Sequence, residues 1–186
     1  MSDLSEILDI WFAPETKEKW FRPPPEFDAE ITERFGALHE EAARDVAVKS
    51  AFADWEDSAD GALALIILLD QFPRNMFRDS PRAFASDGLA LSVAGRAISR
   101  GHDLATAIER RIFFYMPLEH SENIEDQNRC CVLVAERCNI EKYPDFAERH
   151  RVVIERFGRF PHRNEVLGRQ STPAEIEYLA SRDEPF

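Results

Sequence analysis

The stretch from Ala62 to Leu69 is apolar at every position, so no face of it can meet water without cost. A run of this length fits a buried strand or a buried helix, because periodicity alone does not separate the two. Its composition favours the helix: the run is rich in Ala and Leu and contains no Val, Thr or aromatic residue. Since no other segment alternates convincingly enough to pair with it as a strand, the chain is predicted to be all-α around one central buried helix.

A second apolar pattern predicts a long helix beyond the prolines at 23–25. Its residues recur at intervals of three and four, which places them on one side of a helix. They are Phe27, Ile31, Phe35, Leu38, Ala42 and Val46. A first helix is expected after Asp3 and Glu6, and would turn Leu4, Ile7, Leu8 and Trp11 inward.

Helix starts are indicated at two further places. Ser80-Pro81 offers an N-cap with proline in the first turn, and the segment Thr172-Pro173-Ala174-Glu175 adds a capping box. Other helices are expected over residues 89–99, 104–115 (ended by Pro117), 121–138 and 145–157. With such short connections we expect one all-helical domain over residues 1–186, built of antiparallel hairpins without a regular sequence repeat.

The charge of the chain limits its partners. A formal net charge of −12 argues against nucleic acid, since phosphate binding depends on clustered Lys and Arg. No run approaches the length of a membrane span and no export signal is visible at the start. Cys130, Cys131 and Cys138 lie in one short segment without CxxC spacing, which favours reduced thiols in a cytoplasmic protein over a disulfide or a metal site.

A short motif occurs twice, as Phe72-Pro73-Arg74-Asn75 and as Phe160-Pro161-His162-Arg163-Asn164. Each copy is expected where a helix ends, and its guanidinium and amide suit the binding of carbonyls, carboxylates or an anion. Asp70 ends the buried helix, where a carboxylate needs a nearby cation. Arg74 is the local candidate, and Arg163 or Arg159 are the distant ones.

Polar residues also fall on apolar helix faces. Gln127 or Asn128 shares a face with Ile124, and His150 shares one with Phe146, Val153 and Phe157, so an amide and a histidine are expected inside. For His150, the commoner role is that of a hydrogen-bonded core residue. Between residues 149 and 169 the chain has six Arg and two Glu, a local basic field that suits an anion.

The segment from Met116 to Glu122 places His120 between Glu119 and Glu122. Such a cluster suits acid–base chemistry, but it lacks the spacing that directs two ligands at one metal ion, so we predict no metal site. In the alternative interpretation Ser121 caps the next helix and Glu122 complements its dipole. Trp20 and Phe21, beside the prolines, fit a docking patch, core packing or a lid equally well.

Three motifs together resemble one bacterial family, that of domain of unknown function 924. They are Leu68–Asn75, Met116–Glu122 and Arg156–Asn164, and the similarity runs from Leu8–Phe12 to Ser171–Glu175. The resemblance implies a fold similar to tetratricopeptide-type helical hairpins. It implies no activity and no catalytic residues.

Two functions remain open. In the first, the motifs form one pocket for a small anionic metabolite, and His120 or His162 transfers a proton in a hydrolase- or lyase-like reaction. The remaining residues assigned to this pocket are Asp70, Gln71, Arg74, Asn75, Glu119, Gln127, His150, Arg159, Arg163, Asn164 and Arg169. In the second, the motifs cap helices in a non-catalytic scaffold that binds a peptide or protein. No cofactor motif is present in the sequence, so we expect no cofactor.

Overall fold

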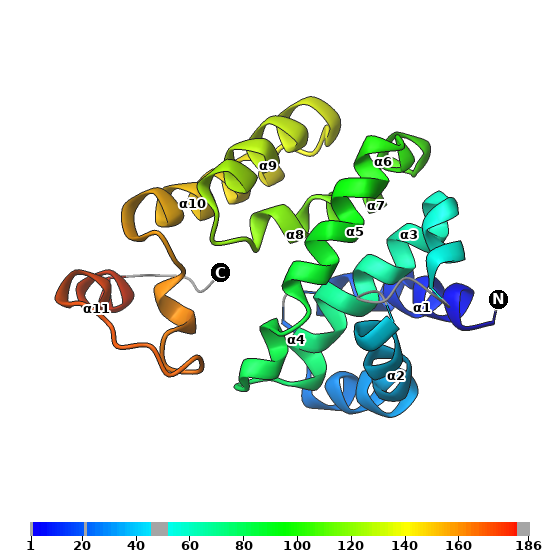
Figure 1. The fold of residues 1–186 in the computed structure, drawn as a ribbon, viewed down its shortest axis with the longest axis horizontal. Helices are drawn as coiled ribbons and strands as arrows, with labels where there is room; N and C mark the ends of the chain where they lie inside the picture. The colour runs from blue at the N-terminus through cyan, green and yellow to red at the C-terminus, as the bar shows by residue number, and fades with distance from the viewer. Residues whose placement is uncertain (1, 21, 46–51, 182–186) are drawn as a thin grey trace.

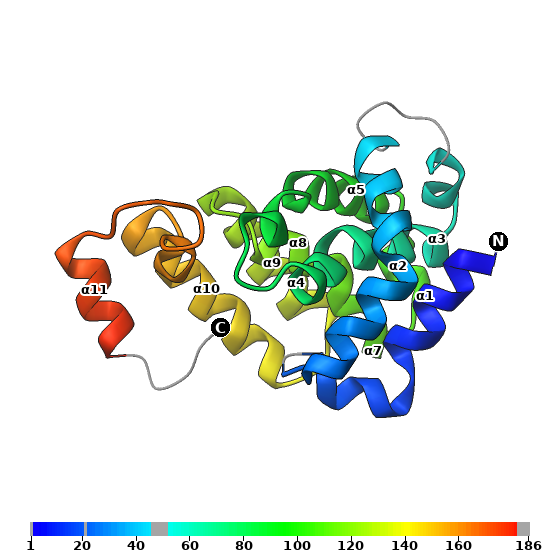
Figure 2. The same ribbon diagram turned by 90° about the horizontal axis from the view of Figure 1, so that it is seen from below.

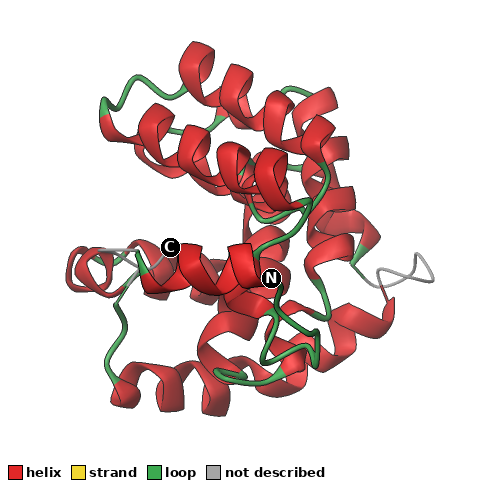
Figure 3. Ribbon diagram, turned by 90° about the vertical axis from the view of Figure 1, so that its left-hand side faces the viewer, coloured by secondary structure: helices red, strands yellow, loops and turns green. Residues whose placement is uncertain are grey.

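The computed structural model describes residues 2–20, 22–45 and 52–181. Every regular element in these ranges is a helix, which confirms the all-α prediction (Figure 3). Val46 of the predicted stripe, and Phe21, lie outside the described residues. Among the described helices, none is long and apolar enough to cross a membrane.

The α-helices are α1 (Ser2–Phe12), α2 (Pro25–Asp45), α3 (Ala59–Ile66), α4 (Phe72–Met76), α5 (Asp87–Ser99), α6 (His102–Ala105), α7 (Ile108–Arg111), α8 (Met116–Glu119), α9 (Ile124–Arg137), α10 (Lys142–Phe157) and α11 (Pro173–Ala180). The short 3₁₀ helices are η1 (Pro14–Lys19), η2 (Ala53–Asp57), η4 (Pro81–Phe84), η5 (Ile112–Phe114) and η6 (Pro161–Arg163). A π-helical segment, η3 (Ile67–Gln71), joins α3 to α4.

The centre of the molecule is α3, with η3 as its continuation. Every side chain from Ala62 to Leu69 is 0% exposed, because α1, α2 and α5 pack around this segment (Figures 1 and 2). The predicted central buried helix is therefore confirmed. The α2 stripe is buried at Phe27, Ile31 and Phe35, as the periodicity predicted.

The single helix predicted over residues 104–115 is wrong. The chain forms α6, an extended residue at Thr106, then α7 and η5. Arg111 donates to the Thr106 carbonyl (Nη2···O 3.1 Å), and Asp103 is fully buried where it accepts a hydrogen bond from a guanidinium of α9. These contacts replace helical bonds. Pro117 lies in the first turn of α8, where proline is tolerated, and so begins a helix instead of ending one.

The C-terminal third consists of the packed pair α9 and α10, followed by η6 and α11 (Figure 1). Asn123, not Ser121, caps α9, and Ile124 is 37% exposed instead of buried. Phe146 was also predicted inside, but it is 40% exposed. A small apolar cluster around Phe160 holds the last segment to α10.

The two predicted caps are present. Ser80 accepts a hydrogen bond from the Arg82 backbone at the start of η4, and Thr172 and Glu175 form the capping box of α11. Both caps are local, so the sequence alone was sufficient to locate them.

Candidate functional site

The site begins where the central helix changes its winding at η3. In a π-turn the backbone bonds are displaced, and side chains from other elements bond its carbonyls. His39 Nδ1 lies 3.0 Å from the Leu68 carbonyl, and Ser86 Oγ donates to the Leu69 carbonyl at 2.6 Å. The chain stays helical through η3 and passes directly into α4.

This continuation corrects two predictions. Asp70 does not end the buried helix but lies within its π-helical continuation. The first copy of the repeated motif, Phe72–Asn75, lies inside α4 and is not a helix exit. The second copy does follow a helix end: α10 stops at Phe157, Gly158 takes a left-handed conformation (φ 67°), and η6 begins at Pro161. The two copies thus occupy different backbone settings.

A buried carboxylate and a histidine form the centre of the site. Asp70 is 0% exposed, and its Oδ1 lies 2.8 Å from Nδ1 of His120. Gln71 donates to the other oxygen, Oδ2, at 2.5 Å. Burial acts to raise the pKa of Asp70, but its interactions with His120, and then with Arg74, outweigh burial and lower that pKa. Asp70 is therefore a carboxylate at neutral pH.

The ionised Asp70 fixes the tautomer of His120. A carboxylate only accepts hydrogen bonds, so Nδ1 of His120 must carry the proton. Burial, and then the charge of Arg74, lower the pKa of His120 below its ordinary value of 6.5. At neutral pH the ring is therefore neutral, and its Nε2 is a proton acceptor. The side chain is 16% exposed and borders a cavity.

This arrangement predicts the titration of His120. In ¹⁵N-edited NMR spectra, Nδ1 will carry the proton, Nε2 will be unprotonated at pH 7, and the ring will titrate below pH 6.5. The low value follows from burial beside the Arg74 charge. A ring protonated at both nitrogens at pH 7 would contradict the assigned geometry.

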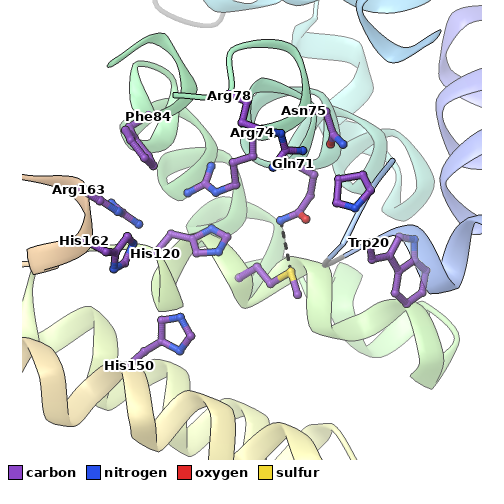
Figure 4. A pocket seen from close by; sticks show the side chains of 12 residues that line it. Trp20, Gln71, Arg74, Asn75, Arg78, Phe84, His120, His150, His162 and Arg163 are labelled. Carbon is purple, nitrogen blue, oxygen red and sulfur yellow. Dashed lines mark hydrogen bonds between the residues drawn. The ribbon is translucent and has the colours of Figure 1, made fainter. Parts of the chain in front are cut away.

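The cavity beside His120 has a volume of about 260 Å³ and an open mouth. It lies between α4, α8, α10, η6 and the segment that precedes α2 (Figure 4). Its lining residues are Trp20, Pro23, Gln71, Arg74, Asn75, Arg78, Phe84, Met116, His120, His150, His162 and Arg163. Seven of the predicted site residues meet here. Six of them come from three separate motifs, and the seventh, His150, comes from α10.

Two of the three cavity arginines are held by carboxylates. Arg74 donates to both oxygens of Asp87 (2.9 and 3.2 Å) and to the backbone carbonyl of Asp70 (2.5 Å). Arg78 donates twice to Asp28, at 3.0 and 2.7 Å, and Asn75 donates to the same carboxylate at 2.8 Å. These charges are largely committed to the fold.

Arg163 is bound differently. Its side chain is 8% exposed, yet its nearest carboxylate oxygen, on Asp87, is 3.5 Å away. Its Nε is buried without a hydrogen-bond partner in the described chain. The guanidinium lies over the rings of Phe84 (4.7 Å) and Phe160 (4.5 Å), which fix its plane. Burial, and then the charge of Arg74, lower the pKa of Arg163 to about 10, which shows a cation with too little compensation.

Other predicted residues lie outside the cavity. Arg159 binds Glu175 and not Asp70, Arg169 binds Glu122, and Asn164 donates to Ser171. Gln127 is fully buried, as predicted, and its Nε2 donates to backbone carbonyls, that of Glu119 among them at 2.6 Å. These side chains stabilise the walls of the site.

Glu119 lies behind the cavity wall. It is 7% exposed, and its Oε1 is 3.1 Å from Nδ1 of His150, which also meets the Phe146 carbonyl at 2.9 Å. Since Glu122 turns to Arg169, the two glutamates do not converge on His120. Within the described ranges, no group of three or more His, Cys, Asp and Glu side chains is placed to hold a metal ion.

Five lining residues were not predicted: Trp20, Pro23, Arg78, Phe84 and Met116. Arg78 lies in the turn after α4, so its only signal in the sequence was its closeness to the first copy of the motif. Trp20 stacks on Trp11 (centroids 6.2 Å apart) and lines the cavity, which excludes a purely exposed patch. Phe84 gave no signal in the sequence.

The fold and the cavity define an all-helical protein with a polar site rich in arginine and histidine. The chain belongs to the family described as bacterial protein of unknown function (DUF924), whose model matches residues 7–183. This confirms the resemblance found in the sequence.

A solved structure is similar over almost the whole chain. It is a protein of unknown function from Agrobacterium tumefaciens, 42% identical, with a TM-score of 0.87, and the match covers 96% of this chain and 97% of that one. No curated protein matches.

Proposed function

We propose that this chain binds a small anionic metabolite, bearing a carboxylate or phosphate, in the cavity beside His120, and that His120 transfers a proton to or from it. The observation that carries the proposal is the buried guanidinium of Arg163: among the residues that the structure describes, its Nε has no partner and its one ion pair is long. A buried cation in this state is costly until an anion completes its hydrogen bonds. An anion in the cavity would pair with the guanidinium of Arg163 where this side chain lines the cavity.

The Asp70–His120 pair supplies the chemistry. With Nδ1 held by Asp70, the ring presents Nε2 to the cavity as a general base, and the carboxylate stabilises the imidazolium that forms when Nε2 takes a proton. The same ring then returns the proton to a leaving group. A hydrolase- or lyase-like reaction needs such a group beside a fixed cation.

The experiment is a thermal-shift titration with acetate and inorganic phosphate. The wild type will gain stability with at least one of these anions, because an anion that binds only the native state raises its melting temperature. Arg163→Met will lose this gain, while Arg149→Met, which makes the same charge change at a half-exposed position on α10, will keep it. Equal shifts in the two variants would overturn the proposal.

A second candidate is a non-catalytic, tetratricopeptide-like scaffold in one domain over residues 1–186, acting in the cytoplasm and binding a peptide or protein. It is favoured by the internal pairing of Arg74, Arg159 and Arg169, which serves the fold alone. The scaffold candidate gives no role to the incompletely paired Arg163 or to the fixed tautomer of His120. Unchanged melting temperatures with every anion would favour this candidate.

A further inference from the structure

We infer that the ligand of this cavity is an amphipathic monocarboxylate, with its carboxylate at Arg163 and an apolar, preferably aromatic, group toward Trp20 and Met116. The inference rests on the proposed function and narrows the ligand to one chemical class. Two independent features of the cavity support it: its charge balance and the distribution of its apolar side chains.

The charges allow one additional negative charge at low cost. Three guanidinium groups face three carboxylates, and His120 is neutral, so the formal sum of this group is zero. The ionised groups are Arg74, Arg78, Arg163, Asp28, Asp70 and Asp87. A monoanion at Arg163 adds one negative charge to a partly buried site, whereas a dianionic phosphate adds two, close to Asp70 and Asp87. The balance therefore favours a carboxylate.

Among the apolar lining residues, Phe84 lies against Arg163, whereas Trp20 lies on the other side of His120. In Figure 4, Arg163 and His162 lie to one side of the His120 ring, and Trp20 lies to the other, beyond Gln71. Met116 lies beside Gln71, whose Nε2 donates to its Sδ at 3.3 Å, and Pro23 also lines the cavity. Trp20 is held in place by its Nε1, which donates to the Trp11 carbonyl at 2.8 Å, so its ring is a fixed apolar surface. A ligand that reaches from Arg163 past His120 would meet this surface.

Calorimetric titrations of the wild type at pH 7.5 with four probes separate the contribution of the ligand's charge to affinity from that of its apolar group. The probes are 3-phenylpropanoate, its neutral amide, acetate and inorganic phosphate. We expect 3-phenylpropanoate to bind at least about tenfold more tightly than acetate, because its ring leaves water. We expect a similar advantage, about tenfold or more, over the amide, which lacks the charge for Arg163. Phosphate will bind no more tightly than acetate.

A variant locates the carboxylate end of bound 3-phenylpropanoate, and NMR locates its phenyl end. Arg163→Met will abolish the preference for the acid over the amide. Intermolecular NOEs will join the phenyl protons of the bound acid to the Met116 methyl group. Absence of these NOEs in a bound complex would overturn the placement of the apolar end.

The outcomes distinguish this inference from the proposed function. Phosphate binding more tightly than both carboxylates, with the gain lost in Arg163→Met, would overturn the monocarboxylate and leave the anion site intact. Acid and amide binding equally, with no effect of Arg163→Met, would overturn the anion site itself. Failure of all four probes to bind would overturn both.

Discussion

Arg74→Met will lower the free energy of unfolding by about 3 kcal/mol, whereas Arg163→Met will change it by less than about 1 kcal/mol. Arg74 holds both oxygens of Asp87 and the Asp70 carbonyl, so its loss leaves two carboxylates without their main cation. The expected loss is near the lower end for broken buried pairs, since the Arg74 side chain is still 23% exposed. Arg163 has one long ion pair, and methionine can fill its place between two phenyl rings.

Urea unfolding of both variants at pH 7 will measure the difference. Arg74→Lys is the matched control: it keeps the charge but not the planar fork that binds Asp87 at two points, so its loss should be intermediate. An equal loss of about 3 kcal/mol at both positions would show that the second motif is structural as well. The ligand role of Arg163 would then be withdrawn.

The contrast matters because the two arginines occupy the same place in the repeated motif. The first copy lies within a helix whose π-turn brings Gln71 to the cavity and buries Asp70 behind His120, and Arg74 lies near the carboxylate of Asp70. The second copy follows a helix end and places Arg163 against the same cavity from the other side. Similar residues thus serve the fold in one copy and remain incompletely paired in the other.

The sequence predicted the elements whose causes are local. The buried run of α3, the stripe of α2 and the Thr172–Glu175 capping box depend on residues a few positions apart, and all three are present. The break at Thr106 was missed because part of its cause is distant in the sequence: Arg111, which bonds the Thr106 carbonyl, also bonds the carbonyl of Arg137, and the Arg137 side chain bonds Asp103. No pattern near Thr106 records those contacts.

The same division holds for the site. Asp70 was expected to need a cation, and Arg74 is near it, but its shortest side-chain contact to a basic group is with His120, fifty positions along the chain. The π-turn was invisible because His39 and Ser86, which bond its carbonyls, are distant in sequence. Phe84 was not predicted at the cavity because its contact with Arg163 joins residues that are far apart in the sequence. Local sequence patterns identified most of the polar residues of the site. The partner of each residue could not be predicted, because it depends on how distant elements pack.

The pH dependence of stability will be governed in part by Glu119, and Glu119→Gln will reveal it. Burial, and then the negative charge of Asp70, raise the pKa of Glu119 from 4.5 to about 8. Between these values the folded protein keeps a proton that the unfolded chain has released, so the contribution of Glu119 becomes less favourable as the pH rises. The free energy of unfolding that is lost through Glu119 over this pH range is at most about 5 kcal/mol, because each pKa unit corresponds to about 1.36 kcal/mol.

Glutamine is neutral at every pH and has nearly the same shape, so Glu119→Gln removes this cost. Relative to the wild type, the variant will gain free energy of unfolding between pH 5 and pH 8.5, by an amount on the order of 3 kcal/mol in urea titrations at several pH values.

Glu122→Gln is the control variant, for which the expected change in stability has the opposite sign. Burial acts to raise the pKa of Glu122, but its bonds with Arg169 and the Phe160 N–H lower it, so this variant will lose stability above pH 4.5. Parallel pH profiles for Glu119→Gln and the wild type would mean that Glu119 is ionised at neutral pH.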